Sequence, residues 1–118
     1  MSDTSLLETF ENAFPGRDYV IEHVAEEFTS VCPKTGHPDF ATVILRYVAN
    51  DKCIELKALK LYYQSFRNKG IFYEATTNTI LEDLVAATNP RWMEIETHWT
   101  GRGGIHSVIT ARHDADDS

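Results

Sequence analysis

Cysteine is scarce in this sequence, with Cys32 and Cys53 the only two among 118 residues. Neither cysteine has a companion cysteine or histidine at the spacing of a structural zinc site. The five histidines also lack a metal-ligand spacing; they are His23, His37, His98, His106 and His113. The sequence therefore predicts that the protein's chemistry requires no metal.

Long apolar runs are also missing. No stretch approaches the roughly 20 apolar residues of a membrane-spanning helix. The N-terminus lacks the charged and then apolar start of a signal peptide. We therefore expect a cytoplasmic protein without a membrane partner, in which both thiols stay reduced.

Positive charge is in short supply, because 11 Lys and Arg face 18 Asp and Glu, for a formal net charge of −7. A nucleic-acid-binding protein normally presents a basic face, so direct binding of nucleic acid is not expected. The basic residues gather in the middle of the chain, at Lys52, Lys57, Lys60, Arg67 and Lys69. An acidic protein with a central basic patch suits a small anionic ligand.

The order of strand-like and helix-like patterns predicts one α+β domain over residues 1–118. Residues 1–17 are expected to form an N-terminal arm and residues 113–118 an acidic tail. β-Branched and alternating patterns predict strands at 19–31, 40–49, 92–99 and 106–112, and residues 53–59 are expected to pair back on 40–49 as a hairpin. Helical spacing predicts helices at 60–68 and 71–88. An antiparallel sheet covered by helices on one face follows.

Residues 32–40 join a cysteine to an aspartate through a segment with two prolines and a glycine. Such residues favour an ordered loop, which would hold Cys32 and Asp39 close together. A thiolate with a nearby proton donor is a device for nucleophilic catalysis. The alternative is that Cys32 is a small buried hydrophobe and Asp39 caps a turn or helix.

A second motif, Glu-Leu-Lys-Ala-Leu-Lys-Leu-Tyr, occupies residues 55–62 and is followed by Ser-Phe-Arg-Asn and Gly-Ile-Phe-Tyr-Glu at 65–68 and 70–74. Together with the loop from Cys32 to Asp39, it resembles the unimodular NADPH-dependent 7-cyano-7-deazaguanine reductases of queuosine biosynthesis, a tRNA modification pathway. The resemblance covers about residues 14–112. It implies the tunnelling fold, with the order ββααββ and two helices on one face of a four-stranded antiparallel sheet. It also implies a ring-like homo-oligomer with active sites at subunit interfaces.

The resemblance implies roles for the thiol and the carboxyl group. Cys32 would attack the nitrile carbon of the substrate to form a covalent thioimide. Asp39, held partly out of water beside an aromatic residue such as Phe40, would protonate the nitrogen. Two hydrides from two NADPH molecules would then complete the reduction to an aminomethyl group.

Substrate-binding residues are also implied by the resemblance. Glu74 would accept N–H groups from the guanidine-like edge of the deazaguanine. Tyr73 occupies the position where most members have histidine, which predicts substrate contact and leaves a role in proton transfer open. Ile54, Glu55 and Leu56 would contact the substrate largely through their backbone groups.

Lys57 and Lys60 resemble the family's NADPH-binding residues, and Arg102 would add a phosphate contact from a glycine-rich segment. The alternatives are a solvated lysine face and a simple hairpin turn. No Gly-x-Gly-x-x-Gly motif is present, so NADPH would not be held by a Rossmann domain.

Three other functions remain open at this stage. An amidinotransferase would use the same nitrile chemistry within tRNA without NADPH, but the complete motif at 55–62 and the negative charge speak against it. A non-catalytic purine- or pterin-binding oligomer would keep Glu74 and leave Cys32 incidental. A thiol redox sensor would leave both Asp39 and Glu74 unexplained.

Overall fold

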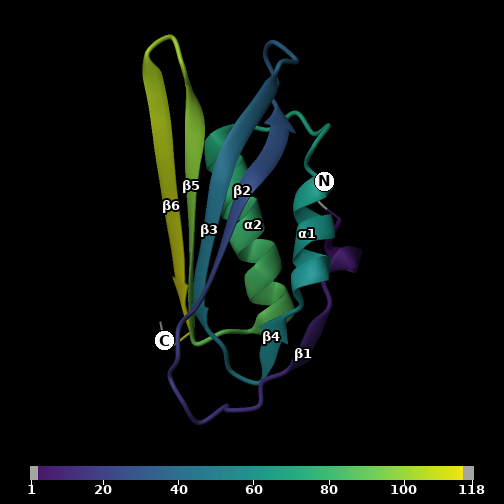
Figure 1. Ribbon diagram of the computed structural model, residues 1–118, viewed down its shortest axis with the longest axis vertical. Helices are drawn as coiled ribbons and strands as arrows, with labels where there is room; N and C mark the ends of the chain where they lie inside the picture. Colours follow the sequence, from purple (N-terminus) through teal and green to yellow (C-terminus); the bar gives the residue numbers. More distant parts are fainter. Residues whose placement is uncertain (1–2, 116–118) are drawn as a thin grey trace.

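Four long antiparallel strands form the main sheet of the computed structural model, which describes residues 3–115. They are β2 (Ile21–Val31), β3 (Pro38–Val48), β5 (Trp92–Arg102) and β6 (Ile105–Asp114), in the spatial order β2-β3-β5-β6. Helices α1 (Leu56–Gln64) and α2 (Tyr73–Thr88) lie on one face of this sheet (Figure 1). The predicted α+β class is confirmed.

Strict alternation along β5 places Met93, Ile95, Thr97 and Trp99 in the core, as its period of two predicts. These side chains share the interior with β3 and with the inner faces of both helices. On the opposite face, Arg46 makes ion pairs with glutamates of both neighbouring strands, and Val24, Phe40 and Val108 are exposed. The helices therefore cover the face of the sheet that carries the buried core.

The prediction that residues 53–59 pair with residues 40–49 as a hairpin is wrong. Only Lys52–Ile54 form a strand, β4, and it pairs with β1 (Thr9–Glu11). The Glu55 carboxylate accepts hydrogen bonds from the N–H groups of Lys57 (3.0 Å) and Ala58 (2.8 Å). Because this N-cap begins α1 at Leu56, the helix starts four residues before the predicted position 60 and ends the strand early.

The two ends of the chain also carry more structure than expected. The segment predicted as an N-terminal arm contains a short 3₁₀ helix, Thr4–Leu6, and strand β1. At the other end, β6 continues to Asp114, so the predicted tail at 113–118 begins as strand. Asp116 and Asp117 lie outside the described residues.

A β-bulge interrupts the pairing of β5 with β6 between Trp99 and Arg102. Without the bulge, the alternation of side chains would place Arg102 on the face of the sheet away from the helices. The extra residue of β5 instead places Arg102 on the face covered by the helices, where it forms an ion pair with Asp39. Gly103 and Gly104, with φ of 59° and 81°, then form the two-residue turn into β6.

Within residues 3–115, neither helix has the length and apolar character needed to cross a bilayer.

Candidate active site

The loop at 32–37 is closed by two backbone hydrogen bonds. The Cys32 N–H donates to the His37 carbonyl (2.9 Å), and the Gly36 N–H donates to the Cys32 carbonyl (2.8 Å). Gly36 has a φ of 74°, which is why a glycine suits this position. The ordered loop is confirmed, but it ends before Asp39, which is the second residue of β3.

The Cys32 thiol lies in an environment that favours its thiolate. Hydrogen bonds from the Thr35 hydroxyl, and then from the backbone N–H groups of Thr35 and Lys34, lower the pKa of Cys32. Partial burial and the charge of Asp39 oppose this effect without cancelling it. The loop therefore favours the thiolate, which is the nucleophilic form of a cysteine.

Asp39 is buried, with 5% of its surface exposed. Its Oδ1 atom forms an ion pair with Nη2 of Arg102 at 2.7 Å and accepts a longer hydrogen bond from the Tyr73 hydroxyl at 3.4 Å. Phe40 is 52% exposed and, as the next residue of the strand, points to the other face. The aromatic side chain beside Asp39 is therefore Tyr73, and the prediction of Phe40 in this place is wrong.

Tyr73 and Glu74 are brought to Cys32 by the segment that precedes α2. The Val31 N–H donates to the Lys69 carbonyl (2.9 Å), and the Ile71 N–H donates to the Val31 carbonyl (3.0 Å). The first turn of α2 thus begins beside the cysteine loop. A cavity of about 250 Å³ lies here, lined by Cys32, Asp39, Phe72, Tyr73, Glu74 and Arg102.

The Tyr73 ring stacks on Trp99, with centroids 4.1 Å apart and an interplanar angle of 12°. Burial and then the charge of Asp39 raise the pKa of Tyr73. The phenol therefore stays protonated near neutral pH and serves as a hydrogen-bond donor. Glu74 is exposed at the mouth of the cavity, where its carboxylate can accept N–H groups from a ligand.

Ile54, Glu55 and Leu56 are not part of this cavity. They line a second pocket of about 300 Å³ beside β1 and β4, near the opposite end of a molecule that is 47 Å long (Figure 1). The Ile54 N–H already donates to the Tyr47 oxygen (2.9 Å), and the Glu55 N–H donates to the Glu8 carbonyl (3.0 Å). Within one chain, residues 54–56 therefore lie in a different pocket from Tyr73 and Glu74.

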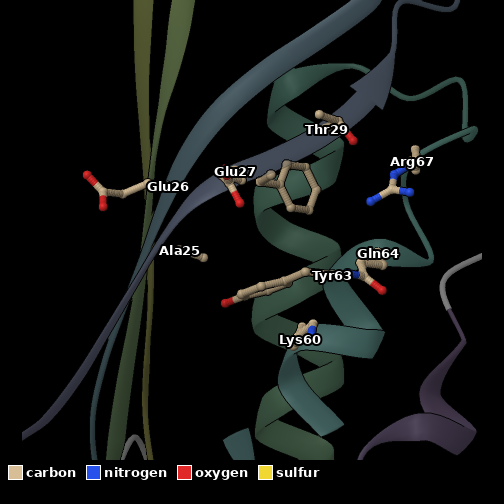
Figure 2. A pocket seen from close by; sticks show the side chains of 9 residues that line it. Ala25, Glu26, Glu27, Thr29, Lys60, Tyr63, Gln64 and Arg67 are labelled. Atoms are coloured by element: carbon tan, nitrogen blue, oxygen red, sulfur yellow. The ribbon is translucent and has the colours of Figure 1, made fainter. Parts of the chain in front are cut away.

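Lys60 borders a third cavity, of about 440 Å³, between α1 and the bulged part of β2. Figure 2 shows Lys60, Gln64 and Arg67 around this cavity and Glu26 directed away from it. The buried Tyr63 hydroxyl has no hydrogen-bond partner among the described residues. Lys57 is exposed one turn earlier on α1. Lys60 and Arg67 are exposed cations at this cavity, where they could contact the phosphates of a dinucleotide, although Glu27 also lines it.

Two features of the site were missed from the sequence. Thr35 donates to the Cys32 thiol, and the signal that could have found it is a hydroxyl residue in a tight turn after a cysteine. The ion pair between Arg102 and Asp39 depends on the β5 bulge, for which the glycine at 101 was the available signal. Within residues 3–115, no three His, Cys, Asp or Glu side chains are arranged to hold a metal ion.

Comparison with known proteins gives consistent matches. The family model described as QueF-like protein matches residues 38–118. A Chloroherpeton thalassium protein is 60% identical over 111 residues, covering 94% of this chain and 96% of the relative. A Prosthecochloris aestuarii protein is 58% identical over 112 residues, covering 95% of each. Both are named NADPH-dependent 7-cyano-7-deazaguanine reductase.

A solved structure is also similar to this chain. It is the apo crystal structure of the archaeosine synthase QueF-Like, with a TM-score of 0.76 and 20% sequence identity. The alignment covers 84% of this chain and 96% of that one. At this identity the similarity establishes the shared fold alone.

Proposed function

The chain belongs to the QueF-like family, and we propose that it is an NADPH-dependent reductase that converts the nitrile of 7-cyano-7-deazaguanine to the aminomethyl group of 7-aminomethyl-7-deazaguanine. This conversion belongs to queuosine modification of tRNA. The observation that carries the proposal is the cavity in which a thiol of lowered pKa lies near a buried carboxyl group.

The first step is an addition to the nitrile. The Cys32 thiolate attacks the nitrile carbon, a C–S bond forms, and one π bond of the C≡N group breaks. Its electron pair goes to nitrogen, which takes a proton from the carboxylic acid form of Asp39. The product is a neutral thioimide on Cys32. The Tyr73 hydroxyl holds Asp39 in position through its hydrogen bond to Oδ1.

Glu74 is proposed to bind the heterocycle. Its exposed carboxylate can accept two N–H bonds from the guanidine-like edge of the substrate, which fixes both position and orientation. Tyr73 contacts the substrate beside it. Ile54, Glu55 and Leu56 complete the binding site from another subunit, because they lie at the far end of their own chain.

A first hydride from NADPH would add to the carbon bound to Cys32, after which the C–S bond would break, returning the Cys32 thiolate and leaving an imine. A second hydride and a second proton would convert the imine to the amine, so the four-electron reduction would consume about two equivalents of NADPH. Lys57, Lys60 and Arg102 are proposed to hold its phosphates, because all three are exposed cations. No metal is required by this scheme.

The proposed assembly is a ring-like homo-oligomer. Strands β2 and β6 are the two edges of the main sheet, and edge-to-edge pairing between subunits would satisfy their free backbone groups. We place the enzyme in the cytoplasm, where its free Cys32 thiol would stay reduced.

The test is to mix the purified protein with 7-cyano-7-deazaguanine without cofactor and record the absorbance of the thioimide. NADPH is then added and its oxidation is followed. We expect an adduct that is absent in Cys32→Ala and consumption of about two NADPH per nitrile. An adduct without NADPH oxidation would point to amine transfer, and no adduct would leave a binding protein.

A further inference from the structure

The ion pair between Arg102 and Asp39 conflicts with the acid role of Asp39. Nη2 of Arg102 lies 2.7 Å from Oδ1 of Asp39 and covers this oxygen, whereas donation of a proton to the nitrile nitrogen requires the carboxyl group to face the substrate. The same arginine is a proposed ligand of the cofactor. Both roles cannot be fulfilled by one fixed position of the side chain.

We infer that Arg102 exchanges between two anions, the Asp39 carboxylate and a phosphate of the dinucleotide, so that cofactor binding uncovers Oδ1 of Asp39 for the nitrile nitrogen. The inference rests on the proposed function, because the second anion is the cofactor's. It makes Arg102 a positioning residue that links the cofactor site to the acid.

The geometry of Arg102 suits such an exchange. Within residues 3–115, both polar contacts of its guanidinium involve one nitrogen, Nη2, which also donates to the Pro38 carbonyl (2.8 Å). A guanidinium has five N–H donors, so other donors are available to a second anion. The side chain is 43% exposed, whereas that of Asp39 is 5% exposed. The arginine can therefore reach a ligand that the carboxylate cannot.

The side chain of Arg102 is held by the two contacts of Nη2, and its neighbours in the chain add none. Residues 101, 103 and 104 are glycines and contribute no side chains. A Cβ at Gly101 would lie 3.2 Å from the Ile105 carbonyl oxygen, so the bulge is closely packed. The proposed exchange therefore involves the side chain of Arg102 and not its backbone. The other ionisable groups around the cavity are Cys32, Tyr73 and Glu74.

The coupling between the two anions must be reciprocal. If cofactor binding takes Arg102 away from Asp39, then neutralising Asp39 must strengthen cofactor binding. We expect Asp39→Asn to bind NADP⁺ at least about fivefold more tightly than the wild type, measured by calorimetry. NADP⁺ carries no hydride to transfer, so the measurement does not depend on turnover.

A double-mutant cycle separates exchange from a general effect of charge. In an Arg102→Met background, Asp39→Asn should leave the affinity for NADP⁺ unchanged. Asp114→Asn is the matched control, because it releases Arg112 from an ion pair of 3.0 Å and should change nothing. Equal strengthening with and without Arg102 would overturn the inference, as would wild-type or weaker affinity in Asp39→Asn.

The rate of adduct formation gives a second, independent test, which requires a substitution of Arg102 alone. In the wild type, saturating NADP⁺ should speed formation of the thioimide. In Arg102→Met the cofactor-free rate should already equal this faster rate, and NADP⁺ should add nothing.

An adduct that forms in the wild type at a rate indifferent to NADP⁺ would overturn the exchange and leave the reductase intact. A slower cofactor-free rate in Arg102→Met would also overturn it. The absence of any adduct in the wild type would instead remove the proposed function itself.

Discussion

Thr35 illustrates how a single hydroxyl group sets the reactivity of the site. Its side chain is the largest cause of the lowered pKa of Cys32, ahead of the two backbone N–H groups of the same turn. Because the thiolate is the reactive form, the hydroxyl extends the reactive range of Cys32 toward lower pH.

Replacing Thr35 with valine should therefore raise the pKa of Cys32 and shift the pH profile of its alkylation by iodoacetamide to higher pH. The shift should be partial, because the backbone donors remain. Cys53 is 4% exposed and contributes little to the signal. Thr35→Ser, which keeps the hydroxyl, is the control, and an unchanged profile in Thr35→Val would contradict this account.

Tyr73 combines a stacked ring with a hydroxyl group that donates to Asp39. Tyr73→Phe keeps the ring and loses one hydrogen bond, so adduct formation should slow by roughly 2- to 10-fold. Because the pKa of Tyr73 is raised above 10.0, this ratio should stay constant from about pH 6 to about pH 9.

Stopped-flow absorbance of the thioimide across that range measures the ratio. Tyr73→Ala, which removes the ring from Trp99 as well, should be slower still. A ratio that changes with pH in this range would show that the phenol titrates during the reaction.

At the scale of the element, Glu55 both ends β4 and starts α1. Two backbone N–H groups lower the pKa of its carboxyl group below the ordinary value of 4.5. The ionised cap therefore stabilises the fold above that pH, and the contribution is lost as the pH falls through the lower pKa of the folded state.

Glu55→Ala should accordingly unfold at a lower urea concentration than the wild type at pH 7. The difference between the two proteins should shrink in acid, as the wild-type carboxyl group becomes protonated. Glu82→Ala, at an exposed position of α2, is the matched control. A difference that persists unchanged in acid would mean that the cap is not electrostatic.

The elements differ in how well the sequence predicts them. The period of two along β5 fixes which side chains enter the core, so the sheet and its buried face follow from the pattern. The start of α1 does not, because residues 53–59 fit a strand equally well and the outcome depends on the hydrogen bonds of Glu55. A three-residue partner such as β1 leaves hardly any pattern to recognise.

In the candidate site, contacts between residues close in the sequence are also predicted better than contacts between distant residues. Cys32 and Asp39 are predicted to be close because a short loop joins them, and the cavity confirms it. The contact of Arg102 with Asp39 spans 63 positions and depends on one extra residue in β5. Local patterns do not determine such a register shift, so the sequence predicted Arg102 for the cofactor alone.

At the scale of the whole molecule, the predicted substrate-binding residues form two groups near opposite ends of the long axis. Tyr73 and Glu74 lie at one end, and residues 54–56 lie at the other. Two inactive variants should therefore complement each other when mixed. Cys32→Ala removes the nucleophile at one end, and Leu56→Arg blocks the pocket at the other end, where Leu56 is 59% exposed.

In an equal mixture of subunits, one interface in about four joins two intact ends, so about a quarter of the wild-type activity should return. The mixture is prepared by denaturing and refolding the two variants together, and light scattering confirms assembly. Each variant refolded alone is the control. A mixture that stays inactive after correct assembly would show that the site is not shared between subunits.

The stacked pair of Tyr73 and Trp99 also gives the protein an optical reporter at the end of the molecule that holds Cys32 and Asp39. The sequence has two tryptophans, and Trp99 lies directly against Tyr73, while Trp92 is covered by Arg112 at the far end of the same strand. Emission from Trp99 depends on what touches its ring. When tryptophan alone is excited, a Trp92→Phe protein would therefore fluoresce from Trp99, and binding beside Tyr73 could be followed without a label.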